Sequence, residues 1–174
     1  PKYYPRIAVD KNAWRKGKFY STTSWQSEVP LPYFSFDEYS IHKPAVDFDK
    51  GIKGAVFLAR NCNSLNNRES WIKGLIEHGF RVDALGSCLH NAETPPGANL
   101  RLSKALILAF YLFDMTFENQ NVEDYITEKL WLALGSGVIP VYLGAPNAGE
   151  HFPQNSMIFV SDFKGPKELA AYLN

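Results

Sequence analysis

The stretch FENQNVEDYITEKLW, residues 117–131, gathers polar side chains where an apolar run gives way to a helical pattern. Among them are Asn119, Tyr125, Glu128 and Lys129. A lysine near the start of a helix adds its charge to the partial positive charge of the free backbone amides there. This arrangement suits a diphosphate, because a helix start and a fixed cation can hold its negative charge.

A second cation, Arg68, stands near the start of another predicted helix, so that an arginine and a lysine could hold one diphosphate. Surface roles compete with this interpretation. Adjacent Glu128 and Lys129 are also typical of a solvated ion pair, and Arg68 of an exposed helix start. Tyr125 fits a packed aromatic as well as a ligand contact, and Glu118 is interpreted as a structural carboxylate at a strand end.

The elements that must position these residues alternate along the chain. Short apolar runs predict strands over residues 54–60, 80–85, 112–117, 138–144 and 157–163, and helical patterns occupy residues 66–79, 103–110, 124–137 and 165–173. Such alternation predicts an α/β fold, a Rossmann-like and mostly parallel sheet with helices on both faces.

Two of these helices carry predicted ends and buried faces. Asp124 is expected to cap one helix, and Gly135 and Gly137 to end it. Its buried face is predicted to hold Ile126, Leu130, Ala133 and Leu134. In the other helix, which we expect to end at Gly79, the apolar stripe is Trp71, Ile72, Leu75 and Ile76.

Polar segments follow the carboxyl ends of the predicted strands, which is where open α/β sheets bind their ligands. They cover residues 61–63, 86–88, 118–120 and 144–147. None carries the glycine fingerprint of a dinucleotide-binding loop or of a lysine-containing phosphate loop. This argues against a nicotinamide-dependent oxidoreductase, and we expect side chains to hold any diphosphate.

Composition excludes several other classes. The 174 residues carry 18 basic and 18 acidic side chains, whose zero net charge does not suit sequence-independent binding of nucleic acid. No apolar run approaches the roughly 18 residues of a membrane span, and the first residues do not form a signal peptide. The four histidines are scattered without metal-ligand spacing. No metal site is therefore predicted.

The stretch from Phe117 to Pro146 closely resembles the signature of the α-1,3-fucosyltransferase family, glycosyltransferase family 10. That signature runs F-E-N-S/Q, D-Y-[IV]-T-E-K, G-x-[IV]-P-V and G-x-P, and the match is nearly unbroken. Upstream, ARNCNSLNNRESWIKGL and RVDALGSCLHN look like the S-N-C…R and D-x-x-G-x-C…N segments of the family. SEVPLPY looks like its S-D-x-x-x-P-Y element near the domain crossover. The resemblance covers most of residues 21–173.

The resemblance implies the nucleotide-binding half of a two-domain GT-B glycosyltransferase. Residues 1–50 would be the trailing part of an N-terminal acceptor domain and the crossover, and residues 51–174 a GDP-fucose-binding domain truncated at its C-terminus. It implies an inverting enzyme that moves fucose from GDP-fucose to a hydroxyl of an acceptor oligosaccharide or glycoprotein, commonly α-1,3 to N-acetylglucosamine. The alternative is a non-catalytic sugar-nucleotide or glycan-binding module that keeps the fold.

The resemblance also assigns donor-site residues. Arg68 and Lys129 match the family's diphosphate contacts. Asn119, Tyr125 and Glu128 match positions that line the donor site, with Glu128 at the sugar hydroxyls.

The same resemblance leads to expectations about the catalytic base, the metal requirement and the cellular compartment. The family's base is a glutamate in an E-[SN]-P-like element, which does not occur here, and Glu28 matches a different motif position. We therefore expect the base upstream of Pro1 and no activity from this chain alone. No D-x-D pair stands at a strand end, which argues against an obligatory metal. Homologues are Golgi membrane proteins with a lumenal catalytic domain; there Cys62 and Cys88 could pair, and two free thiols are an equal alternative.

Overall fold

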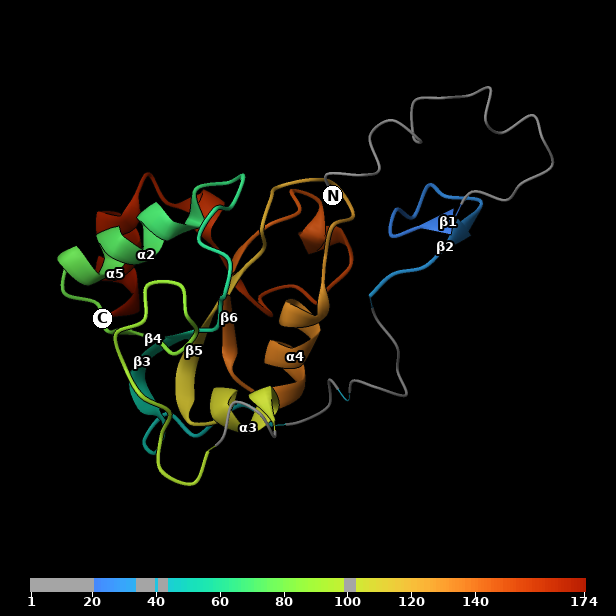
Figure 1. Cartoon of the computed structure of the whole chain (residues 1–174). Coiled ribbons are helices and arrows are strands. Elements are labelled where there is room, and N and C mark those ends of the chain that lie inside the picture. Colours follow the sequence, from blue (N-terminus) through green and yellow to red (C-terminus); the bar gives the residue numbers. More distant parts are fainter. Residues whose placement is uncertain (1–20, 34–39, 41–43, 99–102) are drawn as a thin grey trace.

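The computed structural model describes residues 21–33, 40, 44–98 and 103–174, and it confirms the predicted alternation of strands and helices (Figure 1). The main elements are β3 (Ile52–Phe57), α2 (Arg68–Glu77), β4 (Val82–Ala84), α3 (Lys104–Leu108), β5 (Tyr111–Phe117), α4 (Glu128–Ser136), β6 (Ile139–Leu143), β7 (Ile158–Phe159) and α5 (Pro166–Leu173). Short 3-10 helices cover Ala148–Glu150 and Val160–Asp162. Ahead of the sheet, β1 (Ser21–Thr22) pairs with β2 (Val29–Pro30).

The main sheet has five strands in the order β4-β3-β5-β6-β7, and every neighbouring pair is parallel. From β3 the chain passes through α2 to β4, then returns through α3 to β5 on the other side of β3. The winding direction therefore reverses between β3 and β5. Such a reversal opens a crevice at the carboxyl ends of the two strands, the usual ligand site of this fold class.

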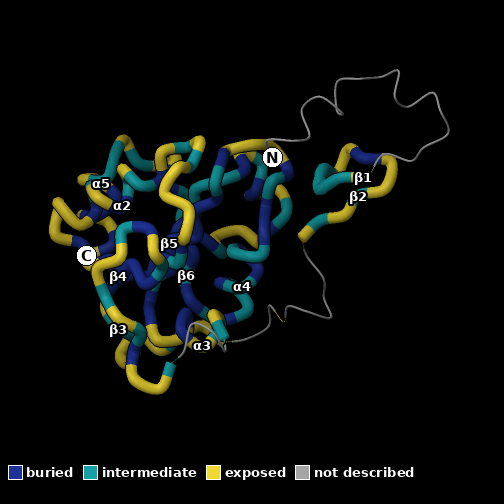
Figure 2. The backbone as a smooth tube through the Cα atoms, viewed as in Figure 1, coloured by how far each residue is buried: buried dark blue, intermediate teal, exposed yellow. Residues whose placement is uncertain are grey.

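Helices cover both faces of the sheet, as predicted. Helices α2 and α5 pack together on one face, and α3 and α4 pack together on the other (Figure 1). Alternate residues of β3 serve the two layers: Phe57 belongs to the core under α2 and α5, and Val56 to the core under α3 and α4. Figure 2 shows the central strands buried and the exposed residues mainly in the outer loops. This two-sided burial explains the continuous apolar runs of the sequence.

The start of α4 differs from the prediction. The helix begins at Glu128, and Asp124 does not cap it, because its carboxylate bonds to distant residues and its backbone is left-handed, with a φ of 62°. Ile126 is buried but precedes the helix. Gly137 ends the helix in a left-handed conformation as predicted, with a φ of 79°, whereas Gly135 lies within the last turn.

The apolar stripe of α2 was predicted in part. Ile72 and Leu75 are fully buried, and the buried face also includes Arg68. Ile76 is 41% exposed, contrary to the prediction. At about 100° per residue it lies roughly 70° from the centre of the face formed by Arg68, Ile72 and Leu75. Gly79 follows the helix with a φ of 83°, as expected of a helix stop.

Candidate functional site

The loops that follow β3 and β5 lie side by side at the point where the sheet reverses. The Leu65 amide donates to the Asn119 carbonyl at 2.8 Å. The side-chain amide of Asn66 donates to the Glu118 carbonyl at 3.1 Å and to the Asn121 side chain at 2.8 Å. The structure thus brings together two of the polar segments that the sequence placed at strand ends.

Glu118, the first residue after β5, has no exposed surface. Its Oε1 accepts from the Thr127 amide and hydroxyl, both at 2.8 Å, and Oε2 accepts from Lys129 Nζ at 3.0 Å. A buried carboxylate requires such donors to offset its lost hydration. The structure therefore confirms Glu118 as a structural strand-end carboxylate, and it shows that this carboxylate fixes the start of α4.

The ammonium of Lys129 is fixed on one side and accessible on the other. Besides Glu118 it contacts Thr127 Oγ1 at 2.7 Å and Glu128 Oε1 at 3.5 Å, and its side chain is 25% exposed. Burial by itself would lower the pKa of Lys129, but the charges of Glu118 and Glu128 outweigh it and the pKa is raised. Lys129 is therefore charged at neutral pH, and it stands at a helix start. For this residue the solvated-surface alternative is wrong.

Tyr125 and Asn119 complete the accessible edge. Both are half-buried, and their side chains share a hydrogen bond. Burial raises the pKa of the Tyr125 hydroxyl, and the negative charge of Glu118 raises it further. The structure thus gathers Asn119, Tyr125 and Lys129 around Glu118, with Glu128 beside Lys129. Whether they contact a ligand stays a prediction.

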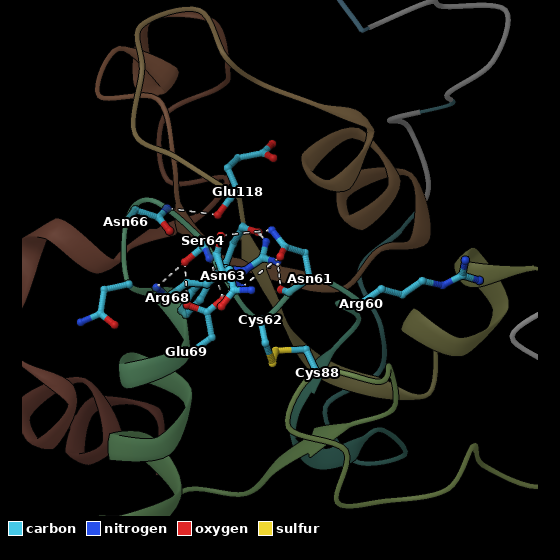
Figure 3. A network of polar contacts seen from close by, with 12 residues as sticks. Arg60, Asn61, Cys62, Asn63, Ser64, Asn66, Arg68, Glu69, Cys88 and Glu118 are labelled. Atoms are coloured by element: carbon cyan, nitrogen blue, oxygen red, sulfur yellow. Dashed lines mark hydrogen bonds and ion pairs between the residues drawn. A yellow bond between two sulfur atoms is a disulfide. The ribbon is translucent and has the colours of Figure 1, made fainter. Parts of the chain in front are cut away.

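Arg68 lies beneath the loops and is only 2% exposed (Figure 3). Its two terminal nitrogens donate to the Phe117 carbonyl at 2.7 Å and to the Asn61 carbonyl at 2.9 Å. The guanidinium also lies 5.6 Å from the centre of the Phe57 ring and 3.5 Å from Glu69. Burial lowers its pKa. Arg68 therefore connects the ends of β3 and β5, and the exposed-surface alternative is wrong; its contact with a diphosphate stays a prediction.

A disulfide joins Cys62 to Cys88, with their Cα atoms 5.2 Å apart, and so decides between the two alternatives that the sequence left open. It ties the loop after β3 to the loop after β4 (Figure 3). Because Cys62 adjoins Asn61, the bridge and the Arg68 hydrogen bond hold the same loop.

A polar stripe on β5 was missed by the sequence reasoning. Asp114 and Thr116 alternate along β5, Glu118 continues the same spacing directly after it, and alternate residues of a strand share a face. Asp114 is buried and accepts from the Thr116 hydroxyl at 2.6 Å. It lines a pocket with Thr116, Glu128 and Lys129, and burial raises its pKa to about 7. The two-residue period of D-x-T-x-E within an apolar strand was the available signal.

The arrangement as a whole places one fixed cation, a helix start and half-buried polar side chains at the crevice of the sheet. This chemistry can bind and stabilise a diphosphate. Among the described residues, no cluster of three or more His, Cys, Asp or Glu side chains could hold a metal ion, and no helix is long and apolar enough to span a membrane.

Curated relatives and solved structures with clear similarity to this chain are fucosyltransferases, and three of them show the extent of the similarity. GDP-fucose protein O-fucosyltransferase 3 of Gallus gallus is 42% identical over 132 residues, covering 71% of this chain and 27% of the relative. Alpha-(1,3)-fucosyltransferase B of Drosophila melanogaster is 36% identical over 192 residues, covering 100% of this chain and 43% of the relative. The crystal structure of an alpha1,3-fucosyltransferase with GDP aligns with a TM-score of 0.59 at 30% identity, covering 79% of this chain and 36% of that one.

The chain thus spans less than half the length of these relatives. The family model described as Glycosyltransferase family 10 (fucosyltransferase) C-term matches residues 49–174, which hold the whole five-stranded sheet and every residue of the candidate site. The chain belongs to glycosyltransferase family 10, the fucosyltransferases.

Proposed function

We propose that the protein containing this chain transfers fucose from GDP-fucose, with inversion, to a hydroxyl of an acceptor glycan, and that residues 51–174 bind the donor. The observation that carries this proposal is the Lys129 ammonium, held by the buried Glu118 at the start of α4 and partly open to solvent. The GDP complex of the similar alpha1,3-fucosyltransferase supports the choice of donor.

The proposed chemistry follows from the charges at this edge. As the bond between fucose and GDP breaks, negative charge grows on the diphosphate and positive charge on the sugar carbon. Lys129 and the free amides of α4 would stabilise the negative charge on the diphosphate, and the half-exposed Glu128 carboxylate would lie near the sugar. Asn119 and Tyr125 would orient the donor. The general base would come from a part of the protein outside this chain.

Two acceptor classes are candidates. The first is a sugar hydroxyl: the names of the Drosophila relative and of the similar solved structure support an α-1,3 linkage, and the sequence resemblance implies N-acetylglucosamine as the sugar. A hydroxyl of a protein side chain is the second candidate, and the name of the Gallus relative favours it.

We also propose that this part of the protein works in the lumen of the Golgi, with a membrane anchor outside the chain. The Cys62–Cys88 disulfide supports an oxidising compartment, because such bridges are rare in the cytosol. Fluorescence microscopy of the tagged protein against Golgi markers, with protease protection in intact vesicles, tests it. Degradation of the domain without detergent would contradict a lumenal location.

The decisive experiment uses the full-length protein and radiolabelled GDP-fucose. Transfer is measured to an N-acetylglucosamine-terminated glycan and, separately, to folded protein domains without glycans. Calorimetric titration with GDP and UDP accompanies the assay, and we expect GDP to bind more tightly. GDP-fucose binding without transfer to any acceptor would favour the non-catalytic module, and equal or tighter binding of UDP would contradict the proposed donor.

A further inference from the structure

The carboxylate of Asp124 joins three segments that are distant in the sequence. Its Oδ2 accepts from the Ser24 hydroxyl at 2.7 Å and from the Trp25 amide at 3.1 Å. Its Oδ1 accepts from the Asn147 side chain at 2.8 Å and lies 3.7 Å from the His151 ring nitrogen. Only 8% of Asp124 is exposed, so these contacts replace most of its hydration.

Further contacts strengthen the same junction. The Asp124 amide donates to Asn147 Oδ1 at 3.0 Å, so these two residues form a reciprocal pair. On the outer side, the ring of Trp25 lies 5.3 Å from that of His151 at an angle of 31°. We call residues 21–33, which hold Ser24 and Trp25, the strap. The strap is therefore fastened to the loop after β5 and to the loop after β6.

The junction directly precedes a residue of the candidate site. Asp124 has a φ of 62°, which is uncommon for a residue with a side chain and persists where surrounding contacts hold it. Tyr125 is the next residue, and its side chain interacts with those of Asn119 and Glu118. Burial and the Glu118 charge raise the pKa of the Tyr125 hydroxyl, and Tyr33 of the strap adds to the rise.

We propose that Ser24 and Trp25 are positioning residues for the donor, which act through Asp124 on the placement of Tyr125. This inference rests on the proposed function, because only that function puts Tyr125 against the donor. Residues 119–127 contain no helix or strand, so apart from a few backbone hydrogen bonds, such as that from the Tyr125 amide to the Val122 carbonyl, side-chain contacts hold their path. The strongest of these at Asp124 come from the strap and from Asn147.

Ser24→Ala in the full-length protein is the first test. It removes the hydroxyl from one Asp124 oxygen and leaves every donor-site residue unchanged. We expect the KM for GDP-fucose to rise about tenfold, the low end of the effect of losing one hydrogen bond to a charged group, with kcat within about twofold. Ser24→Thr keeps the hydroxyl and should restore the KM. A lower melting temperature with an unchanged KM would mean that the strap only stabilises the fold, and would overturn the proposal.

A double-mutant cycle tests the route through Tyr125. If Ser24 acts through that ring, Ser24→Ala should change nothing further in a Tyr125→Ala background. Multiplying effects on the KM would overturn the proposed route. The experiment also separates the two proposals. If the wild-type protein does not bind GDP-fucose, the proposed function is rejected. If the wild type binds it and the Ser24→Ala variant binds it equally well, only the positioning role of the strap is rejected.

Discussion

The ammonium of Lys129 lies 3.0 Å from the carboxylate of Glu118, which has no exposed surface. The cation proposed to meet the diphosphate is therefore paired before any donor arrives, and it is the main charged partner of a buried anion. Two consequences follow. The pair fixes the position of the ammonium, and the removal of Lys129 alone leaves an uncompensated charge in the interior.

Lys129→Ala should reduce both stability and turnover. We expect a loss of about 3 to 5 kcal/mol in the free energy of unfolding, because Glu118 remains buried without its partner. Turnover should fall on the order of 10²-fold, because the ammonium interacts most strongly with charge that develops in the transition state. Urea denaturation measures the first effect and steady-state kinetics the second. Lys129→Arg should recover only part of the turnover, because a planar fork does not fit the place of an ammonium.

The matched control removes both charges at once. Glu118→Gln with Lys129→Met removes both charges of this pair and leaves neither partner uncompensated, so this double variant should be more stable than Lys129→Ala while its turnover stays low. If the double variant keeps near-normal turnover, Lys129 does not belong to the site and its role is structural.

The sequence predicted the elements better than their junctions. The strand runs were readable because β3, β5 and β6 are buried on both faces and are mostly apolar, even though β5 includes Asp114 and Thr116. The start of α4 could not be predicted in this way, because Asp124 bonds to Ser24, a hundred residues away, and local sequence does not reveal such a partner. The propensity of aspartate for a helix start was outweighed by tertiary contacts.

The candidate site was predictable in its location but not in its internal contacts. Parallel strands place their carboxyl ends at one edge, so the gathering of Asn119 with the loop after β3 followed from the topology. The burial of Arg68 did not follow from the topology. Its acceptors are main-chain carbonyls, which every residue type carries, so the sequence does not reveal them. Likewise the spacing of Cys62 and Cys88 permits a bridge but does not require one.

Arg68→Lys tests the connection between β3 and β5. A lysine can satisfy at most one of the two carbonyls that Arg68 reaches, so we expect the free energy of unfolding to fall by about 2 to 3 kcal/mol. Glu69→Gln, which alters the neighbouring charge and keeps both carbonyl contacts, should cost about 1 kcal/mol or less. Urea denaturation compares the two. A loss for Arg68→Lys no larger than for the control would contradict the structural role.

Removal of the disulfide should destabilise the domain and loosen the loop after β3. The bridged cysteines are 26 residues apart, and a loop of that length predicts a loss of about 3 to 4 kcal/mol in the Cys62→Ala/Cys88→Ala variant. Reducing agent should lower the stability of the wild type toward that of the variant. The variant serves as its own control, because reductant should not affect it, and an unchanged wild type under full reduction would contradict the prediction.

Asp114 should make the stability of the domain depend on pH. Burial raises the pKa of its carboxyl from 3.8 to about 7, although the Thr116 hydroxyl and the Lys129 charge oppose the rise. The unfolded chain therefore releases this proton at a lower pH than the folded one. The protonated Asp114 carboxyl therefore contributes fully to stability below a pH of about 4, and this contribution is lost as the pH rises through about 7. The free energy of unfolding lost over this range is about 4 kcal/mol.

Asp114→Asn removes the ionisation and keeps an oxygen that can accept from the Thr116 hydroxyl. The stability of the variant relative to wild type should therefore increase with pH, by about 2 to 3 kcal/mol between pH 5 and pH 8, because most of the wild-type loss falls in that interval. Urea denaturation at the two pH values measures this difference. Thr116→Val is the companion variant: it removes a bond that favours the ionised form, so in wild type it should cost more at pH 8 than at pH 5. In the Asp114→Asn background that dependence should vanish. If the difference in the free energy of unfolding between Asp114→Asn and wild type is the same at both pH values, Asp114 is not the titrating group. If that difference grows with pH, Asp114 is the buried acid beside Lys129.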